Sequence, residues 1–202
     1  KPDILGAIYR IQRKNAASPK DPRGLELDWS KPQVDWLSDK RPAVVNRSIE
    51  ALAKESNVDG LRVAKARIAA LWSLHQIPVK SARAAVRGFL GKESSDVCVA
   101  AIHSAGLWRD SAAVKPLIEI LASDDALLRR LAAMALGRIG DRMAVQPLLE
   151  AGLAKTDPFL KHAIIYALYE IGNEERLPGD HPITKQVRLM HQTGKRSPSP
   201  HV

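Results

Sequence analysis

The sequence has very few of the residues that support covalent or redox chemistry, with one cysteine, Cys98, among 202 residues. A single cysteine excludes an internal disulfide, and the chain contains no Cys-x-x-Cys-His motif for haem attachment. Aromatic residues make up only 4% of the chain. Ala and Leu dominate its middle, which favours closely packed helices over a β-rich core. No apolar run approaches the roughly 18 to 20 residues that span a bilayer, so we expect no membrane contact by this segment.

The charge is uneven along the chain. Residues 1–92 hold 18 Lys and Arg against 9 Asp and Glu, whereas residues 93–202 hold 13 of each, so the net charge of +9 lies in the N-terminal half. A basic region attracts nucleic acid, an anionic surface or an acidic neighbouring domain, or it is simply a solvated face. The chain begins at Lys1 without a leader pattern, which we interpret as a piece of a longer protein.

An internal repeat is the most informative feature of the sequence. Val114–Glu119 returns as Val145–Glu150 after 31 residues, and Ala135–Asp141 returns as Ala167–Asn173 after 32. Weaker copies lie upstream, at Ser104–Asp110, Ala70–Leu74 and Arg41–Leu52. A repeat of this length with apolar residues three and four apart predicts pairs of short helices, about five in all. Because neighbouring pairs bury one another's apolar faces, we expect an all-α solenoid.

Residues that start and stop helices flank the predicted repeats. Side-chain oxygens that can accept backbone N–H groups mark two helix starts, at Ser123-Asp124-Asp125 and at Thr156-Asp157-Pro158, and Asp110 and Asp141 are predicted caps of the helices that follow them. Gly140 and Gly172 mark helix ends. We predict that one aligned position in each repeat fills the core between neighbours: Leu74, Trp108, Ile139 and Ile171.

The stretch Leu136–Leu149 reads Leu-Gly-Arg-Ile-Gly-Asp-Arg-Met-Ala-Val-Gln-Pro-Leu-Leu. It resembles HEAT repeats, in particular the short subclass named after phycobilisome lyases. The resemblance covers roughly residues 33–173 and is sharp from residue 110 onward. It implies a HEAT-type α-α superhelix over residues 33–192, a non-catalytic scaffold that binds a protein partner or neighbouring domains of the same chain. A bilin lyase is a further possibility, implied only by the name of the subclass.

The two ends of the chain do not follow the repeat. Within residues 1–32, Gly6–Arg13 alternates like a strand, which predicts the end of an upstream β-domain followed by a linker. This junction is similar to that in large bacterial proteins of planctomycete type, in which a propeller, HEAT repeats and a cytochrome c domain follow one another. The similarity implies a periplasmic parent; otherwise we expect a cytoplasmic one. We predict a capping helix at His181–His191 and a flexible Pro/Ser-rich tail at residues 193–202.

The sequence predicts no catalytic, cofactor or metal site. Its six histidines show no paired spacing with an acidic companion of the kind that binds a metal. It contains no Gly-rich phosphate loop and no Gly-x-Ser-x-Gly elbow. Cys98 falls in a predicted helix without a recognisable base.

Two basic stripes are the one pattern that indicates a binding surface. At 100° per residue, Arg62, Lys65 and Trp72 fall within about 80° of one another on a single predicted helix. The next predicted helix carries a second stripe, made of Lys80, Arg83 and Arg87. We expect these six residues to attract an anionic partner. Nucleic acid is the alternative partner to protein, by analogy with HEAT-like alkylpurine DNA glycosylases, which cradle DNA on a basic surface.

Overall fold

The structure is a computed structural model that describes residues 20–91, 93–153, 157–172, 177–179 and 181–193. The described residues form ten α-helices and three short 3-10 helices, and they contain no strand. The α-helices are α1 (Pro42–Glu55), α2 (Val58–Val63), α3 (Arg67–Gln76), α4 (Lys80–Arg87), α5 (Ser95–Leu107), α6 (Val114–Leu121), α7 (Ala126–Ile139), α8 (Val145–Leu153), α9 (Pro158–Ile171) and α10 (Pro182–Thr193). The 3-10 helices are η1 (Val34–Ser38), η2 (Ser111–Ala113) and η3 (Arg142–Ala144). None of the helices in these ranges combines the length and the hydropathy needed to cross a bilayer.

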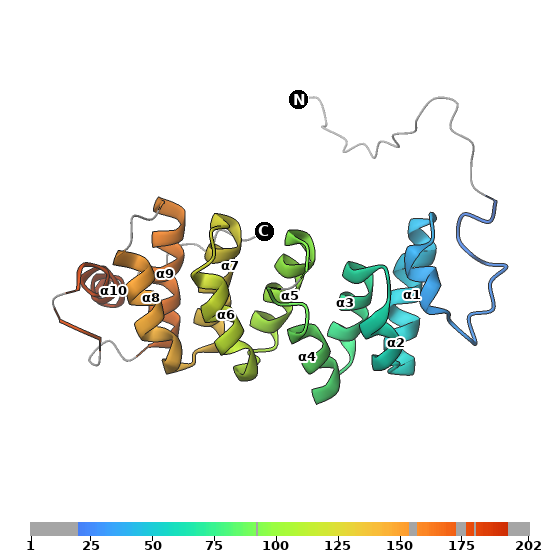
Figure 1. Cartoon of the computed structure of the whole chain (residues 1–202), viewed down its shortest axis with the longest axis horizontal. Helices are drawn as coiled ribbons and strands as arrows, with labels where there is room; N and C mark the ends of the chain where they lie inside the picture. Colours follow the sequence, from blue (N-terminus) through green and yellow to red (C-terminus); the bar gives the residue numbers. More distant parts are fainter. Residues whose placement is uncertain (1–19, 92, 154–156, 173–176, 180, 194–202) are drawn as a thin grey trace, which may run out of the picture.

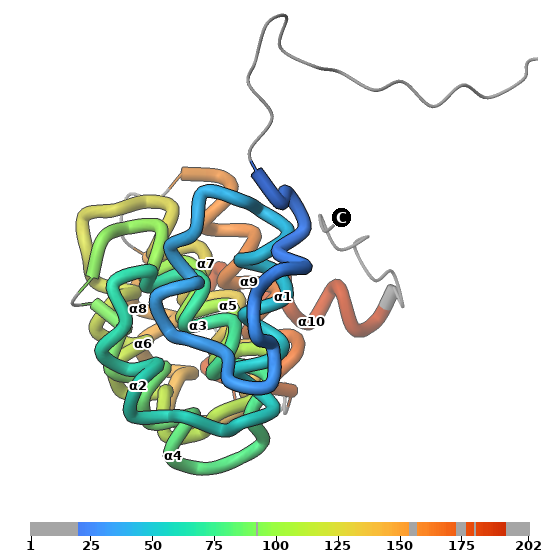
Figure 2. Tube along the Cα trace, turned by 90° about the vertical axis from the view of Figure 1, so that its right-hand side faces the viewer, coloured from blue at the N-terminus to red at the C-terminus, as the bar shows by residue number. Residues whose placement is uncertain are grey.

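The helices form two layers, visible in Figure 1 and, from the end of the stack, in Figure 2. One layer, here called the odd layer, contains α1, α3, α5, α7 and α9 in sequence, each packed against the next. The even layer contains α2, α4, α6 and α8. Each odd helix also packs against the helix that precedes it in the chain, which gives five pairs from η1/α1 to α8/α9. The predicted all-α solenoid of about five helix pairs is confirmed.

Both predicted ends of the chain lie mainly outside the described residues. This applies to the predicted strand Gly6–Arg13 and to residues 194–202 of the predicted tail. The capping helix predicted at His181–His191 is present as α10, which packs on α9 with the His191 and Tyr169 rings 4.2 Å apart.

The predicted aspartate caps are present. Asp125 accepts two backbone N–H groups of α7 at 2.9 and 3.1 Å, and Asp157 accepts two of α9 at 2.9 and 3.0 Å. Asp110 and Asp141 cap η2 and η3 in the same way. Pro116 and Pro147 are the third residues of α6 and α8, in the first turn, where a backbone N–H has no partner inside the α-helix.

Glycine and alanine control how closely the odd helices approach. A Cβ atom added to Gly137 on α7 would lie 2.6 Å from the Cα atom of Ala167 on α9, so the backbones touch through the glycine. The matching Gly106 on α5 is less confined, since its added Cβ would lie 3.3 Å from Ala135. The α7–α9 contact therefore depends on glycine more strictly than the α5–α7 contact does.

The helix ends correct one predicted alignment. α3 ends at Gln76 and α5 at Leu107, a spacing of 31 residues. Trp108 therefore matches the fully buried Ile77, and the predicted match with Leu74 was wrong by three residues. Trp108 follows the last residue of α5 and lies half-buried at the edge of the stack, packed against the core without filling it. α3 contains no glycine equivalent to Gly106 of α5, so the sequence offers no marker for aligning these two helices.

The structure also contradicts the prediction of one helix containing Arg62, Lys65 and Trp72. α2 ends at Val63, Ala64 turns into an extended conformation, and α3 begins at Arg67. The break has a physical reason: Leu61 and Ala64 are buried in the even layer, and the chain must reverse before α3 can bury its own apolar face in the odd layer. The turn contains only Ala and Lys, so no Gly, Pro or Asn marks it in the sequence.

Candidate functional site

The structure places the second predicted basic stripe on one helix, as expected, but it separates the residues of the first. Arg62 lies near the end of α2, Lys65 in the following turn and Trp72 on α3. The other three residues all lie on α4: Lys80, Arg83 and Arg87. Since α2, the turn and α3 run in different directions, the first three residues do not share a helix face.

Two of the α4 arginines have partners inside the chain. Arg87 donates from Nη1 to Oδ2 of Asp110 at 2.5 Å, and the Asp110 residue is only 6% exposed. The guanidinium carbon of Arg83 lies 5.4 Å from the ring centroid of Trp108, a cation–π contact. Both contacts tie α4 to the start of the next repeat. Arg83 and Arg87 are therefore not a free row of cations for phosphates.

Four rings of α3 and α5 form a cluster that the sequence analysis did not predict. The rings of His75 and Trp108 stack with centroids 4.8 Å apart and planes 13° apart. The Trp72 ring makes T-shaped contacts with the rings of His75 and His103, with centroids 5.6 and 6.2 Å apart. Beneath them, His75 Nδ1 lies 2.8 Å from the hydroxyl oxygen of Ser104. These contacts give Trp72 and Trp108 a role in joining two repeats.

The Ser104 and His75 pair has the atoms of a nucleophile and a base, but its burial excludes that chemistry. Ser104 is 0% exposed, so a substrate cannot reach its hydroxyl. Burial lowers the pKa of His75 below its ordinary value of 6.5, and the nearby His103 lowers it further. His75 is therefore neutral at pH 7 and acts as a hydrogen-bonding ring inside the stack. Within the described ranges, no three His, Cys, Asp or Glu side chains gather to hold a metal ion.

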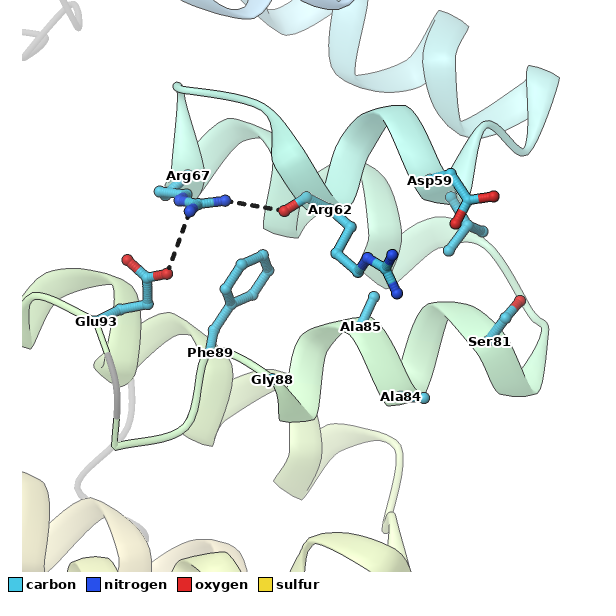
Figure 3. A pocket seen from close by; sticks show the side chains of 10 residues that line it. Asp59, Arg62, Arg67, Ser81, Ala84, Ala85, Gly88, Phe89 and Glu93 are labelled. Carbon is cyan, nitrogen blue, oxygen red and sulfur yellow. Dashed lines mark hydrogen bonds and ion pairs between the residues drawn. The ribbon is translucent and has the colours of Figure 1, made fainter.

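A groove of about 460 Å³ lies between α2 and α4 in the even layer. Figure 3 shows Arg62 reaching down from α2 over Ala85 of α4, with Asp59 toward one end of the groove and Glu93 at the other. At the Glu93 end, Arg67 Nη2 lies 3.5 Å from Glu93 Oε1. Arg62 is thus the residue of the predicted surface that the structure places in a concave site.

The outer face of the odd layer carries exposed apolar side chains. They are, with their exposed fractions, Ile68 (43%) on α3, Leu107 (51%) on α5, Leu127 (42%) on α7 and Phe159 (71%) on α9. Ile68, Leu127 and Phe159 lie in the first turns of α3, α7 and α9, whereas Leu107 is the last residue of α5. We call the face of the odd layer that carries these four residues the odd-layer face.

Comparison with known families fits this arrangement. Residues 114–179 match the family model for HEAT repeats. The match contains α6 to α9, the segment in which the sequence repeat is sharpest, while the helices before α6 continue the same stack with more divergent sequences. No curated protein matches the chain. The fold is therefore a HEAT-type solenoid, a class that commonly mediates protein interactions.

Sequence reasoning missed Arg67, Phe89 and Glu93, because it ran α2 and α3 together and so could not place a groove beside them. One local signal was present: Asn57 precedes Gly60 by three residues, and its Oδ1 accepts the Gly60 N–H at 3.0 Å. A capping residue so close to the next apolar run indicates a very short helix.

Proposed function

We propose that this segment is a non-catalytic scaffold that binds a protein partner through the odd-layer face. The supporting observation is the set of exposed apolar side chains on the odd helices, above all Leu127 and Phe159 in the first turns of the neighbouring helices α7 and α9. Single exposed apolar residues are ordinary, but residues aligned on one face of a solenoid form a contact surface. Leu127 and Phe159 occupy equivalent positions, two residues after the capping Asp125 and Asp157, so the repeat itself presents them side by side.

The contacts that the basic residues make within the chain indicate the class of partner. Arg83 and Arg87 contact Trp108 and Asp110, and Arg67 pairs with Glu93, so these three arginines are already engaged within the chain. A protein partner is therefore favoured over nucleic acid. Fluorescence anisotropy with random-sequence duplex DNA, at about 50 and then about 200 mM salt, tests this preference. Tight binding that falls steeply with salt would favour the nucleic-acid alternative.

The finer resemblances stay predictions. The family match describes HEAT repeats in general, so the phycobilisome-lyase-like subclass and the planctomycete-type parent rest on sequence similarity alone. The role as a spacer between neighbouring domains, and a periplasmic rather than cytoplasmic location, depend on that parent. Identifying the domains that flank residues 1–202 in the full reading frame tests all of these predictions together.

A pair of matched variants tests the odd-layer face. The double variant Leu127→Asp/Phe159→Asp places two charges on the face without touching the core. Met143→Asp, at a residue that is 57% exposed beside α8, is the control. With helicity confirmed by circular dichroism, we expect the double variant to lose partners captured by the tagged chain while the control retains them. Equal capture by all three proteins would refute the proposed face.

A further inference from the structure

The groove between α2 and α4 combines two arginines with an apolar floor. Arg62 comes from α2 and Arg67 from the start of α3, so the short turn at residues 64–66 brings the two guanidinium groups to the same side of the groove. The Arg67 Nη1 atom donates to the carbonyl oxygen of Arg62 at 2.9 Å, which fixes the two residues relative to each other (Figure 3). The site is thus positioned by the break between α2 and α3.

The charges in the groove are only partly compensated. Among the described residues, the guanidinium of Arg62 makes no hydrogen bond or ion pair, and Figure 3 shows it hanging between α2 and α4. Arg67 has Glu93 as its acidic partner, but through one contact of 3.5 Å, longer than the roughly 2.7 to 2.9 Å of a strong charge-assisted bond. An incoming carboxylate can therefore engage Arg62 directly and compete with Glu93 for Arg67.

The floor of the groove suits an extended polypeptide. Ala84, Ala85 and Gly88 line it along α4, and these small residues let a peptide backbone approach the helix closely. Phe89 lies below the Arg67 guanidinium, 5.6 Å from its ring centroid to the guanidinium carbon, and Val58 adds a second apolar wall. A volume of about 460 Å³ is within the range of ordinary ligand sites and accepts a short segment of chain.

We propose that this groove binds a short acidic and apolar segment of a protein partner, with a carboxylate held by Arg62 and Arg67 and an apolar side chain against Ala84 and Val58. The proposal deepens the scaffold function and rests on it in taking a polypeptide as ligand, yet it uses a different layer from the odd-layer face. Charge complementarity carries it: the N-terminal half of the chain has 18 basic against 9 acidic residues.

The same groove fits nucleic acid poorly. Asp59 and Glu93 lie toward its two ends and would repel the phosphates that flank any phosphate bound between the arginines (Figure 3). A carboxylate side chain on a peptide has no such neighbouring charges unless the peptide itself supplies them. The local pattern of two arginines between two carboxylates therefore selects an isolated anion over a polyanion.

The test measures fluorescence anisotropy of a labelled peptide that carries a single Glu among Leu and Ser residues, titrated with the full 202-residue chain. The same peptide with Gln in place of Glu and a labelled duplex DNA are the comparison probes. Arg62→Glu removes the unpaired guanidinium and adds a repelling charge without breaking a described side-chain contact. Arg142→Glu, at an exposed position in η3, makes the same charge change far along the stack and is the matched control.

We expect the Glu peptide to bind more tightly than the Gln peptide, Arg62→Glu to weaken its binding by about tenfold or more, and Arg142→Glu to change it less than about twofold. Ala84→Leu fills the groove without changing charge, so it should also weaken binding. Glu93→Gln releases Arg67 and should strengthen it. Absence of binding by the Glu peptide, equal effects of Arg62→Glu and Arg142→Glu, or DNA binding that alone depends on Arg62 would each overturn the proposal.

The odd-layer variant separates this proposal from the scaffold function. Leu127→Asp/Phe159→Asp should bind the Glu peptide as the unmodified chain does, because its substitutions lie in α7 and α9. If that variant loses its protein partners while the peptide results hold, the two surfaces act independently. If the peptide fails to bind but partner capture still depends on Leu127 and Phe159, the groove proposal fails and the scaffold function stands.

Discussion

The repeats before α6 and those from α6 onward have the same architecture, but different kinds of side chain join neighbouring helices in the two regions. In α7 and α9 the contact is made by small residues, with Gly137 against Ala167, and the helices end at Gly140 and Gly172, which both adopt φ +76°. In α3 and α5 polar and aromatic groups do the joining: His75 contacts both Ser104 and Trp108.

The difference shows that the backbone spacing of a solenoid persists after its sequence pattern has faded. The regular repeats depend on close backbone contact, which tolerates almost no substitution at the contact residue. The divergent repeats depend on specific side-chain contacts between neighbours, including the Arg87–Asp110 ion pair. The divergent half also contains the groove and Arg62, whose guanidinium has no hydrogen bond or ion pair within the described part of the chain, so it is the half with distinctive binding chemistry.

Substitution of the two helix glycines is the strongest way to test this comparison. Gly137→Ala pushes a methyl group into the backbone of α9, and we expect a loss of about 2 to 3 kcal/mol in the free energy of unfolding. Gly106→Ala meets Ala135 at a tolerable 3.3 Å. Its helix-propensity gain of about 1 kcal/mol should offset the crowding. Urea denaturation measures both, and equal losses would contradict the difference between the two contacts.

The contrast between the two regions explains which features of the fold and of the site could be predicted from the sequence. The Leu-Gly-x-Ile-Gly-Asp pattern at Leu136–Asp141 predicted a helix, its end and the next cap correctly, because each residue there has a backbone role. Arg62 was singled out, but its site was not, because the groove exists only through a turn of Ala and Lys residues that carries no turn signal. The contacts of His75 are long-range, and a single sequence does not encode which ring faces which.

Substitution of Asp110 and Asp141, which cap η2 and η3, gives the next largest expected difference in stability. Asp110→Ala removes a cap and also leaves Arg87 without its carboxylate, so we expect a loss of about 2 kcal/mol. Asp141→Ala removes only a cap, formed with the Met143 N–H at 2.9 Å, and should cost about 1 kcal/mol. Thermal unfolding of the two variants compares them. If Arg87→Gln lowers stability in the Asp110→Ala background as much as in the unmodified chain, the ion pair is not the source of the difference.

Substitution of the residues with a left-handed backbone at the helix ends should change the stability by a smaller amount. The changes at the two positions should have opposite signs. Arg109 adopts φ +48° where the later repeat has Gly140 at φ +76°. Arg109→Gly relieves a conformation that costs an L-residue roughly 1 kcal/mol, so we expect a gain of about 0.5 to 1 kcal/mol. Gly140→Ala introduces that strain, and since no atom lies within 4 Å of its added Cβ, the expected loss of about 1 kcal/mol is purely conformational. Chemical denaturation should give opposite signs for the two substitutions.

The smallest expected effect is the contribution of His75, in the divergent half, to the dependence of stability on pH. Because burial and His103 hold the pKa of folded His75 below the ordinary 6.5, the unfolded chain binds a proton more readily than the folded chain in the interval between the two values. The contribution of His75 to stability is therefore fully present above pH 6.5 and is lost as the pH falls through that interval. Exposure of part of the ring keeps the effect small.

An NMR titration of the imidazole signals measures the pKa of His75 directly and should place it below 6.5. His103→Gln removes the lesser cause and should raise that pKa slightly, whereas His75→Gln should flatten the acid limb of a stability profile recorded between about pH 5 and 7.5. A titration midpoint at or above the ordinary value would mean that the stack against Trp108 and the contact with Ser104 do not shield the ring. The divergent repeats would then be joined less tightly than the distances of 4.8 and 2.8 Å indicate.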